Sequence, residues 1–237
     1  MPIDDALAQL GPSIKYPKIE LTSTNGSYIF LPESDYNQNS LGYRYHPDLL
    51  VSKERKYLGK NWHQAHEELA KENSFMLTIR QFVDFLNLLK SGNVYDENRN
   101  KISDKETELI LEDILAQRNP YRAEWLDAEF NTANSKIHIN YHHLINRNLK
   151  REKEPLEDCL MQNKVPGIDL DYWLANATNS QGLPSKNNPN GKLNYYFPRE
   201  GRVARFRANS VRVILDCSDG PLYSDVGLGV RPVKILE

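Results

Sequence analysis

Residues 203–233 read VARFRANSVRVILDCSDGPLYSDVGLGVRPV, and the alternation of apolar and polar side chains in this stretch predicts two β-strands. The apolar faces would be Ala204, Phe206 and Ala208 in the first strand, and Val213, Leu215 and Cys217 in the second. The parity of the alternation changes near Ser210, which predicts a turn or a bulge there. Residues 218–221 end the second strand, a loop of small and polar residues follows, and residues 229–233 read as a final short strand.

The opposite faces of these strands mix cationic, anionic, amide and apolar side chains, a combination that solubility alone does not explain. They carry Arg205, Arg207 and Asn209 in the first strand, and Arg212, Ile214 and Asp216 in the second. Exposed groups such as Ile214, Leu222 and Tyr223 among polar ones are typical of a binding surface. An ordinary edge sheet followed by a loop would give the same alternation, so the pattern alone leaves both interpretations open.

The same stretch contains no Lys, Glu, Gln, Met or Trp, although the sequence upstream contains all of them. These are the amino acids that cannot arise when the two adenines of an AAC codon are randomised. Strands and turns are also poor in Lys and Glu, so the absence is suggestive of codon randomisation without requiring it.

This stretch resembles the variable region of diversity-generating retroelement variable proteins, especially their archaeal and archaeal-virus branch. The resemblance is carried by Arg205, Phe206, Ala208, Ser210, Leu215, Cys217, Pro221, Ser224 and the run Leu228, Gly229, Val230 and Arg231. In that family a reverse transcriptase copies a template repeat with errors at adenines, and the copy replaces the 3′ end of the gene. The resemblance implies a C-type-lectin-like fold of the formylglycine-generating-enzyme subtype, which is α+β with two helices packed on small antiparallel sheets.

The resemblance also implies which side chains change and form a solvent-facing ligand site. Together with strand parity it assigns this role to Arg207, Asn209, Val211, Ile214, Asp216, Ser218, Asp219, Gly220, Leu222, Tyr223, Asp225, Val226 and Gly227. The implied function is non-catalytic recognition of a protein or surface structure on another cell or virus host. The inward residues Phe206, Val213, Leu215, Cys217 and the run 229–231 would hold the backbone while the outward side chains vary.

Length and composition limit the function classes. The chain has 237 residues and a net charge of −2, which gives no electrostatic reason to expect a nucleic-acid partner. Its mean hydropathy is −0.66, and it has no apolar run of membrane-spanning length and no cationic, apolar start that would indicate a signal peptide. We expect a single soluble domain over residues 1–237, with an insertion at about 93–150 and a variable region at about 203–233. Display on a virion or on a cell surface stays open.

Helical periodicity and caps predict three helices. Asn61 would cap the first, in NWHQAHEEL; Thr78 would cap the second, which Gly92 would end; Ser103 would open the third, which stops before Asn119 and Pro120. An apolar strand is predicted at residues 27–31, and the resemblance implies that it pairs with the C-terminal strand.

Between the helices and the C-terminal stretch, three segments have distinct patterns. Residues 126–141 alternate, turn at 131–135 and alternate back, which predicts a β-hairpin. Residues 147–157 carry balanced charges and read as a solvated helix or linker. Residues 176–194 form a polar loop, which could be a rim of the binding site or a mobile connection.

Metal binding by neighbouring histidines has little support in the sequence. His63 and His66, with Glu67, are three residues apart rather than the four that place two ligands on one helix face. His142 and His143 are adjacent, so in a strand their side chains point apart. We therefore expect no metal and no cofactor.

Two alternative functions remain. The formylglycine-generating enzyme shares the implied fold, but its oxidation chemistry uses a redox-active cysteine pair. Here Cys159 lies in a charged stretch and Cys217 on an inward strand face, and we interpret both as free thiols of a protein made in a reducing compartment. A calcium-dependent carbohydrate-binding lectin is the second alternative, but the Glu-Pro-Asn, Gln-Pro-Asp and Trp-Asn-Asp signatures of such lectins are missing. We expect no catalytic residues.

Overall fold

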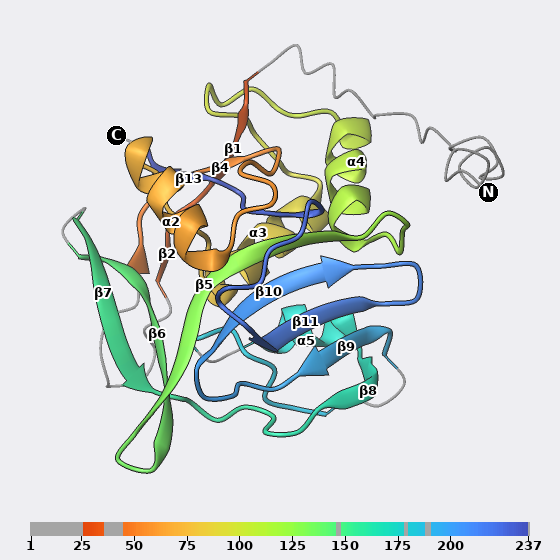
Figure 1. Ribbon diagram of the computed structural model, residues 1–237. Helices are drawn as coiled ribbons and strands as arrows, with labels where there is room; N and C mark the ends of the chain where they lie inside the picture. Colours follow the sequence, from red (N-terminus) through yellow and green to blue (C-terminus); the bar gives the residue numbers. More distant parts are fainter. Residues whose placement is uncertain (1–25, 36–44, 146–147, 178–179, 188–190, 237) are drawn as a thin grey trace, which may run out of the picture.

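In the computed structural model, the two strands predicted from the alternation form an antiparallel hairpin of β10 (Arg202–Ala208) and β11 (Val213–Asp219) (Figure 1). Phe206 lies opposite Leu215, and both are fully buried. The predicted turn is confirmed: the Asn209 side-chain oxygen accepts hydrogen bonds from the backbone N–H groups of Val211 and Arg212, at 2.9 and 3.0 Å. The inward faces of both strands therefore follow from the sequence pattern.

The structure describes residues 26–35, 45–145, 148–177, 180–187 and 191–236. The fold is mixed α+β, as expected. The N-terminal segment that was examined for a signal peptide lies outside the described residues. Every helix of the described part is too short or too polar to cross a lipid bilayer.

One large sheet organises the fold. Its strand order is β7-β6-β5-β10-β11-β9-β8, and β12 pairs with β5 off this path. The strands not yet delimited are β5 (Arg122–Ala133), β6 (Lys136–Ile145), β7 (Asn148–Pro155), β8 (Lys164–Ile168), β9 (Leu193–Tyr196) and β12 (Leu228–Gly229). The β11–β9 and β12–β5 pairs are parallel, so the expectation of small antiparallel sheets is wrong for this sheet. The sheet is also large, because β5 is long enough to pair with β6 along one part and with β10 along another.

A smaller sheet holds the two ends of the described chain together. It has the order β1-β4-β13, formed by Tyr28–Leu31, Leu49–Ser52 and Val233–Ile235. The strand predicted at 27–31 is thus confirmed, but it does not pair directly with the C-terminal strand, because β4 lies between them. A further short pair joins β2 (Ser34–Asp35) and β3 (Tyr45–His46).

The three predicted helices begin at their predicted caps. Asn61 caps α2 (Trp62–Lys71), Thr78 caps α3 (Ile79–Ser91) and Ser103 caps α4 (Asp104–Leu115). Gly92 ends α3 with a φ of 68°, the left-handed conformation that glycine adopts without strain. A fourth helix, α5 (Leu170–Asn176), was not predicted; Asp169 caps it.

Two apolar clusters cover opposite faces of the large sheet. The larger contains the inward side chains of β10 and β11 together with α3 and α5, and the rings of Phe82 and Phe206 lie 5.0 Å apart in it. The smaller contains Trp62 and Leu69 of α2 with Trp125 of β5. Figure 1 shows α2 and the C-terminal segment in front of the sheet and α3 behind it. Both faces are therefore covered where β5 meets β10.

Residues 93–150, predicted as an insertion, supply α4, β5 and β6 and so contribute a central strand of the large sheet. The hairpin predicted there is confirmed, with Phe130 opposite Ile139 and a tight turn at Asn134 and Ser135. The helix or linker predicted at 147–157 is wrong: residues 148–155 form β7 at the sheet edge. Alternating charges are typical of exposed edge strands, where they discourage pairing with other chains.

The loop at 176–194 is buried at its middle, because Gln181 and Leu183 are 3% and 0% exposed. The backbone carbonyl of Gly182 accepts a hydrogen bond of 3.0 Å from the indole of Trp173 in α5. This part of the loop belongs to the core rather than to a rim of a binding site.

Candidate functional site

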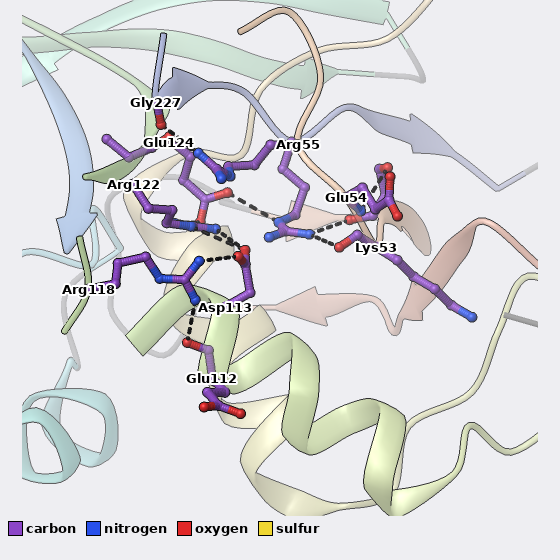
Figure 2. A network of polar contacts seen from close by, with 12 residues as sticks. Lys53, Glu54, Arg55, Glu112, Asp113, Arg118, Arg122, Glu124 and Gly227 are labelled. Atoms are coloured by element: carbon purple, nitrogen blue, oxygen red, sulfur yellow. Dashed lines mark hydrogen bonds and ion pairs between the residues drawn. The ribbon is translucent and has the colours of Figure 1, made fainter. Parts of the chain in front are cut away.

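The backbone of the C-terminal segment is held by a buried network of charged side chains (Figure 2). Arg231 is 2% exposed and donates to the backbone carbonyls of Ser52, at 2.8 Å, and Lys53, and its Nε lies 3.2 Å from Glu124 Oε2. Arg122 lies 3.0 Å from the other oxygen of Glu124. The terminal run that the resemblance assigned to the scaffold is therefore fixed to β4 and β5.

The same network reaches α4 and the loop after β11. Figure 2 shows Arg118 and Arg122 converging on Asp113 of α4, at 3.0 and 3.2 Å. Arg55 donates to the carbonyls of Ala123, at 2.9 Å, and Gly227, at 2.7 Å. Burial raises the pKa of the Asp113 carboxyl, but the surrounding arginines outweigh burial and the net pKa is lowered.

The backbone of residues 220–230 is also anchored by its own main-chain bonds. The Trp62 N–H at the start of α2 donates to Pro221 at 3.1 Å, and the Gly59 N–H donates to Leu228 at 2.9 Å. Lys56 and Val230 exchange two bonds of 2.7 and 3.0 Å. A methyl group added at Gly229 would lie 2.7 Å from the Lys56 carbonyl, which leaves no room for a side chain.

Side chains on this anchored segment stand in solvent. Four of the eight exposed large apolar side chains among the described residues belong to residues 211–226: Val211, Leu222, Tyr223 and Val226. Leu222 is 74% exposed and Val226 is 86% exposed. Leu222, Tyr223 and Val226 belong to one loop, whereas Val211 lies in the turn at the other end of β11.

Next to these residues lies a compact set of charges on the outward face of β10 and β11. The Arg205 guanidinium lies 2.9 Å from the Tyr121 hydroxyl, also pairs with Asp219, and sits 4.7 Å from the ring centre of Tyr223. Arg207 lies 3.2 Å from Asp216. We name Arg205, Arg207, Asp216, Asp219 and Tyr223 the charged face. The two arginines and two aspartates give the charged face no net charge, and their hydrogen-bonding groups are paired with one another.

Burial perturbs two ionisable groups at this face. It raises the pKa of the Tyr121 hydroxyl to about 12, so this group is a neutral hydrogen-bonding phenol. It also raises the pKa of Asp219, although Arg205 opposes that effect.

The structure separates the predicted site residues into three groups. Exposed residues are Val211, Leu222, Tyr223 and Val226; half-buried residues are Arg207, Asn209, Ser218, Asp219, Gly220, Asp225 and Gly227; buried residues are Ile214 and Asp216. The expectation that Ile214 is exposed is wrong, since it is 1% exposed. It belongs to neither apolar cluster, and its neighbours in the sheet are Arg207 of β10 and Asn194 of β9. Asp216, 5% exposed, is covered by the arginines that pair with it.

Gly227 does not fit the predicted role of a changeable side chain. A Cβ atom added there would lie 2.2 Å from the Tyr121 carbonyl oxygen. Gly220, by contrast, has only the end of the Arg202 side chain, at 3.5 Å, near its Cβ position. Of these two predicted positions, only Gly220 has space for variation.

Both cysteine side chains are shielded from solvent. Cys159 and Cys217 are buried and free. Burial raises the pKa of Cys159 to about 12 and raises that of Cys217 well above its usual range. The reactive thiolate is therefore disfavoured at both positions.

The structure brings together residues that the sequence did not connect. His66 of α2 and His142 of β6 meet at Asp127 of β5, and one ligand atom from each residue lies within 4.8 Å of the others. In the sequence, His66 is near His63 and His142 is next to His143, so neither pair indicates this grouping. Among the described residues this is the one convergent group of three such side chains, and its imidazoles do not suit Ca²⁺. No local signal could have revealed it, because the three residues belong to separate elements.

Comparison with known proteins found no matching family model, no matching curated protein and no matching solved structure. The site is therefore interpreted from its own residues and from the resemblance of residues 203–233.

Proposed function

We propose that this chain is a non-catalytic recognition protein in which a C-type-lectin-like scaffold displays a hypervariable surface diversified by a retroelement. The observation that carries the proposal is the contrast within residues 211–231. Their backbone is bonded to α2, β5 and the loop after β4, whereas Leu222, Tyr223 and Val226 extend into solvent. A backbone fixed in this way lets the exposed side chains change without loss of the fold.

The chemistry of the surface favours a protein or another cell-surface structure as the ligand. Tyrosine and arginine, which lie side by side here as Tyr223 and Arg205, are enriched among the residues that contribute most binding energy at protein interfaces. Contacts within the charged face fix its hydrogen-bond donors before a ligand binds. The Arg205 guanidinium lies against the Tyr223 ring, and Arg207 pairs with Asp216. Preorganised side chains lose less conformational entropy on association.

An oxidoreductase related to the formylglycine-generating enzyme is the weaker alternative. Its chemistry needs an accessible thiolate, and burial disfavours that form at Cys159 and Cys217. Turnover of a thiol peptide substrate in the presence of copper would support the enzyme and overturn the recognition proposal.

A pair of libraries tests the proposal. One randomises the exposed residues Val211, Leu222, Tyr223 and Val226; the matched control randomises the buried residues Val203, Phe206, Leu215 and Val230. Both are displayed on yeast, sorted for resistance to protease and then selected against one defined protein. We expect most members of the first library to stay folded and to yield binders, and most of the second to be cleaved. Equal loss of folded members from both libraries would contradict the proposal.

A further inference from the structure

Three side chains from three elements converge beside α2. The Nδ1 atom of His142 lies 2.9 Å from Asp127 Oδ2, and the Nε2 atom of His66 lies 3.4 Å from Asp127 Oδ1. The two imidazole rings are 5.0 Å apart. These three residues are not part of the charged face, so a ligand bound by them would be separate from the proposed recognition surface.

Of the two carboxylate oxygens of Asp127, only one accepts ordinary hydrogen bonds from the described residues. Asp127 Oδ2 accepts from the backbone N–H of His142 at 2.8 Å and from its ring. Asp127 Oδ1 and His66 Nε2 are both buried and make no hydrogen bond among the described residues. The Asp127 side chain is 1% exposed, so its second oxygen is shielded from bulk water. The two atoms lie 3.4 Å from each other, which is longer than an ordinary N–H···O hydrogen bond, so a bound ion would satisfy both better than they satisfy each other.

We propose that His66, Asp127 and His142 bind a divalent first-row transition-metal ion, with Zn²⁺ as the best match. Two imidazole nitrogens and one carboxylate oxygen form a common ligand set for zinc and related ions. Ligand atoms bound to one such ion lie about 3 to 3.5 Å from each other, since each is about 2.0 to 2.2 Å from the metal. His142 Nδ1 and His66 Nε2 lie 2.9 and 3.4 Å from different oxygens of Asp127, and one ligand atom from each of the three residues lies within 4.8 Å of the others, so small side-chain rotations would bring three ligand atoms into this range.

The exposure of the two histidines allows an ion to enter. Their side chains are 19% and 27% exposed, whereas the carboxylate between them is buried. An ion bound there would keep positions for water, as in zinc sites with three protein ligands. The carboxylate neutralises part of the ion's charge.

An ion at this place would join α2 to β5 and β6. The helix already contacts the sheet through the Trp62 indole, which donates to Leu126 at 3.0 Å, and its first N–H holds Pro221. A ligand bond from His66, one turn further along the helix, would add a second attachment. Binding should therefore raise the melting temperature of the folded chain.

The test uses the full chain, stripped of metal with EDTA and dialysed. Zn²⁺ is titrated by calorimetry, Co²⁺ is titrated by visible absorption, and melting is followed with and without Zn²⁺. We expect one ion per chain, a Co²⁺ spectrum with nitrogen ligands, and a melting temperature raised by several degrees. The variants His66→Ala and His142→Ala should each weaken binding tenfold or more.

His63→Ala is the matched control, because His63 lies on the same helix and is exposed. It should bind Zn²⁺ as the unmodified chain does. His66→Gln replaces His66→Ala if the latter does not give a folded circular-dichroism spectrum. Absence of Zn²⁺ and Co²⁺ binding would overturn the proposal and leave a hydrogen-bonded His-Asp-His cluster that packs the helix. Binding that His66→Ala and His142→Ala retain would overturn it as well.

Discussion

Replacing Arg231 by methionine should destabilise the fold strongly, because Arg231 fixes the end of the segment that carries the exposed side chains. Methionine keeps the apolar stem and removes the guanidinium, which donates to two buried carbonyls and to Glu124. Removing one partner of a buried ion pair costs about 3–5 kcal/mol. Glu124 keeps Arg122 at 3.0 Å, so we expect the lower end, about 3 kcal/mol.

Urea unfolding at pH 7, followed by circular dichroism, measures this loss. With a slope of about 2 kcal/mol per molar urea, the midpoint should fall by about 1.5 M. Arg151→Met is the matched control: its side chain is 60% exposed and pairs with Glu129 at the surface, so the loss should stay below about 1 kcal/mol. Combining Arg231→Met with Glu124→Gln should cost less than the sum of the two, since each single variant already removes the ion pair between Arg231 and Glu124. A loss for Arg231→Met as small as that for Arg151→Met would refute the reasoning.

Three further predictions concern the C-terminal segment and the buried residues that hold its backbone. Leu215→Ala should lower the free energy of unfolding by about 2–5 kcal/mol, while Leu222→Ala, at a site 74% exposed, should leave it nearly unchanged; urea unfolding of both variants decides this. Gly227→Ala should cost about 1–3 kcal/mol because its Cβ would press on a backbone carbonyl, whereas thermal melting of Gly220→Ala should match the unmodified chain. Burial raises the pKa of Glu124, but the neighbouring arginines lower it more, so its ionised form stabilises the fold at neutral pH. That stabilisation should be lost as the pH falls below about 4, and the unfolding midpoint of Glu124→Gln should change less over this range; equal acid sensitivity of both proteins would count against it.

Local patterns in the sequence predict the parts of this fold that depend on near neighbours. The caps at Asn61, Thr78 and Ser103 were found because each bonds within one helical turn. The inward faces of β10 and β11 follow from the period of a strand, so Phe206 and Leu215 are buried as predicted.

Features that depend on distant neighbours could not be predicted in this way. Alternation places Ile214 on the outward face, but whether that face is covered depends on β9 and on the length of Arg207. Balanced charges in β7 are equally compatible with a solvated helix and with an edge strand. The grouping of His66 with Asp127 arises from the packing of α2 on the sheet.

If residues 203–233 are diversified for recognition, as proposed, the DNA that flanks the gene should carry the template of that diversity. We predict a near-copy of the segment that encodes these residues, beside a reverse-transcriptase gene and differing only where the copy has adenine. The changed codons should include those of Leu222, Tyr223 and Val226 and spare those of Leu215 and Arg231. Flanking DNA without such a repeat, or a repeat whose differences fall on Phe206, Leu215 and Arg231, would show that this segment is not diversified for recognition.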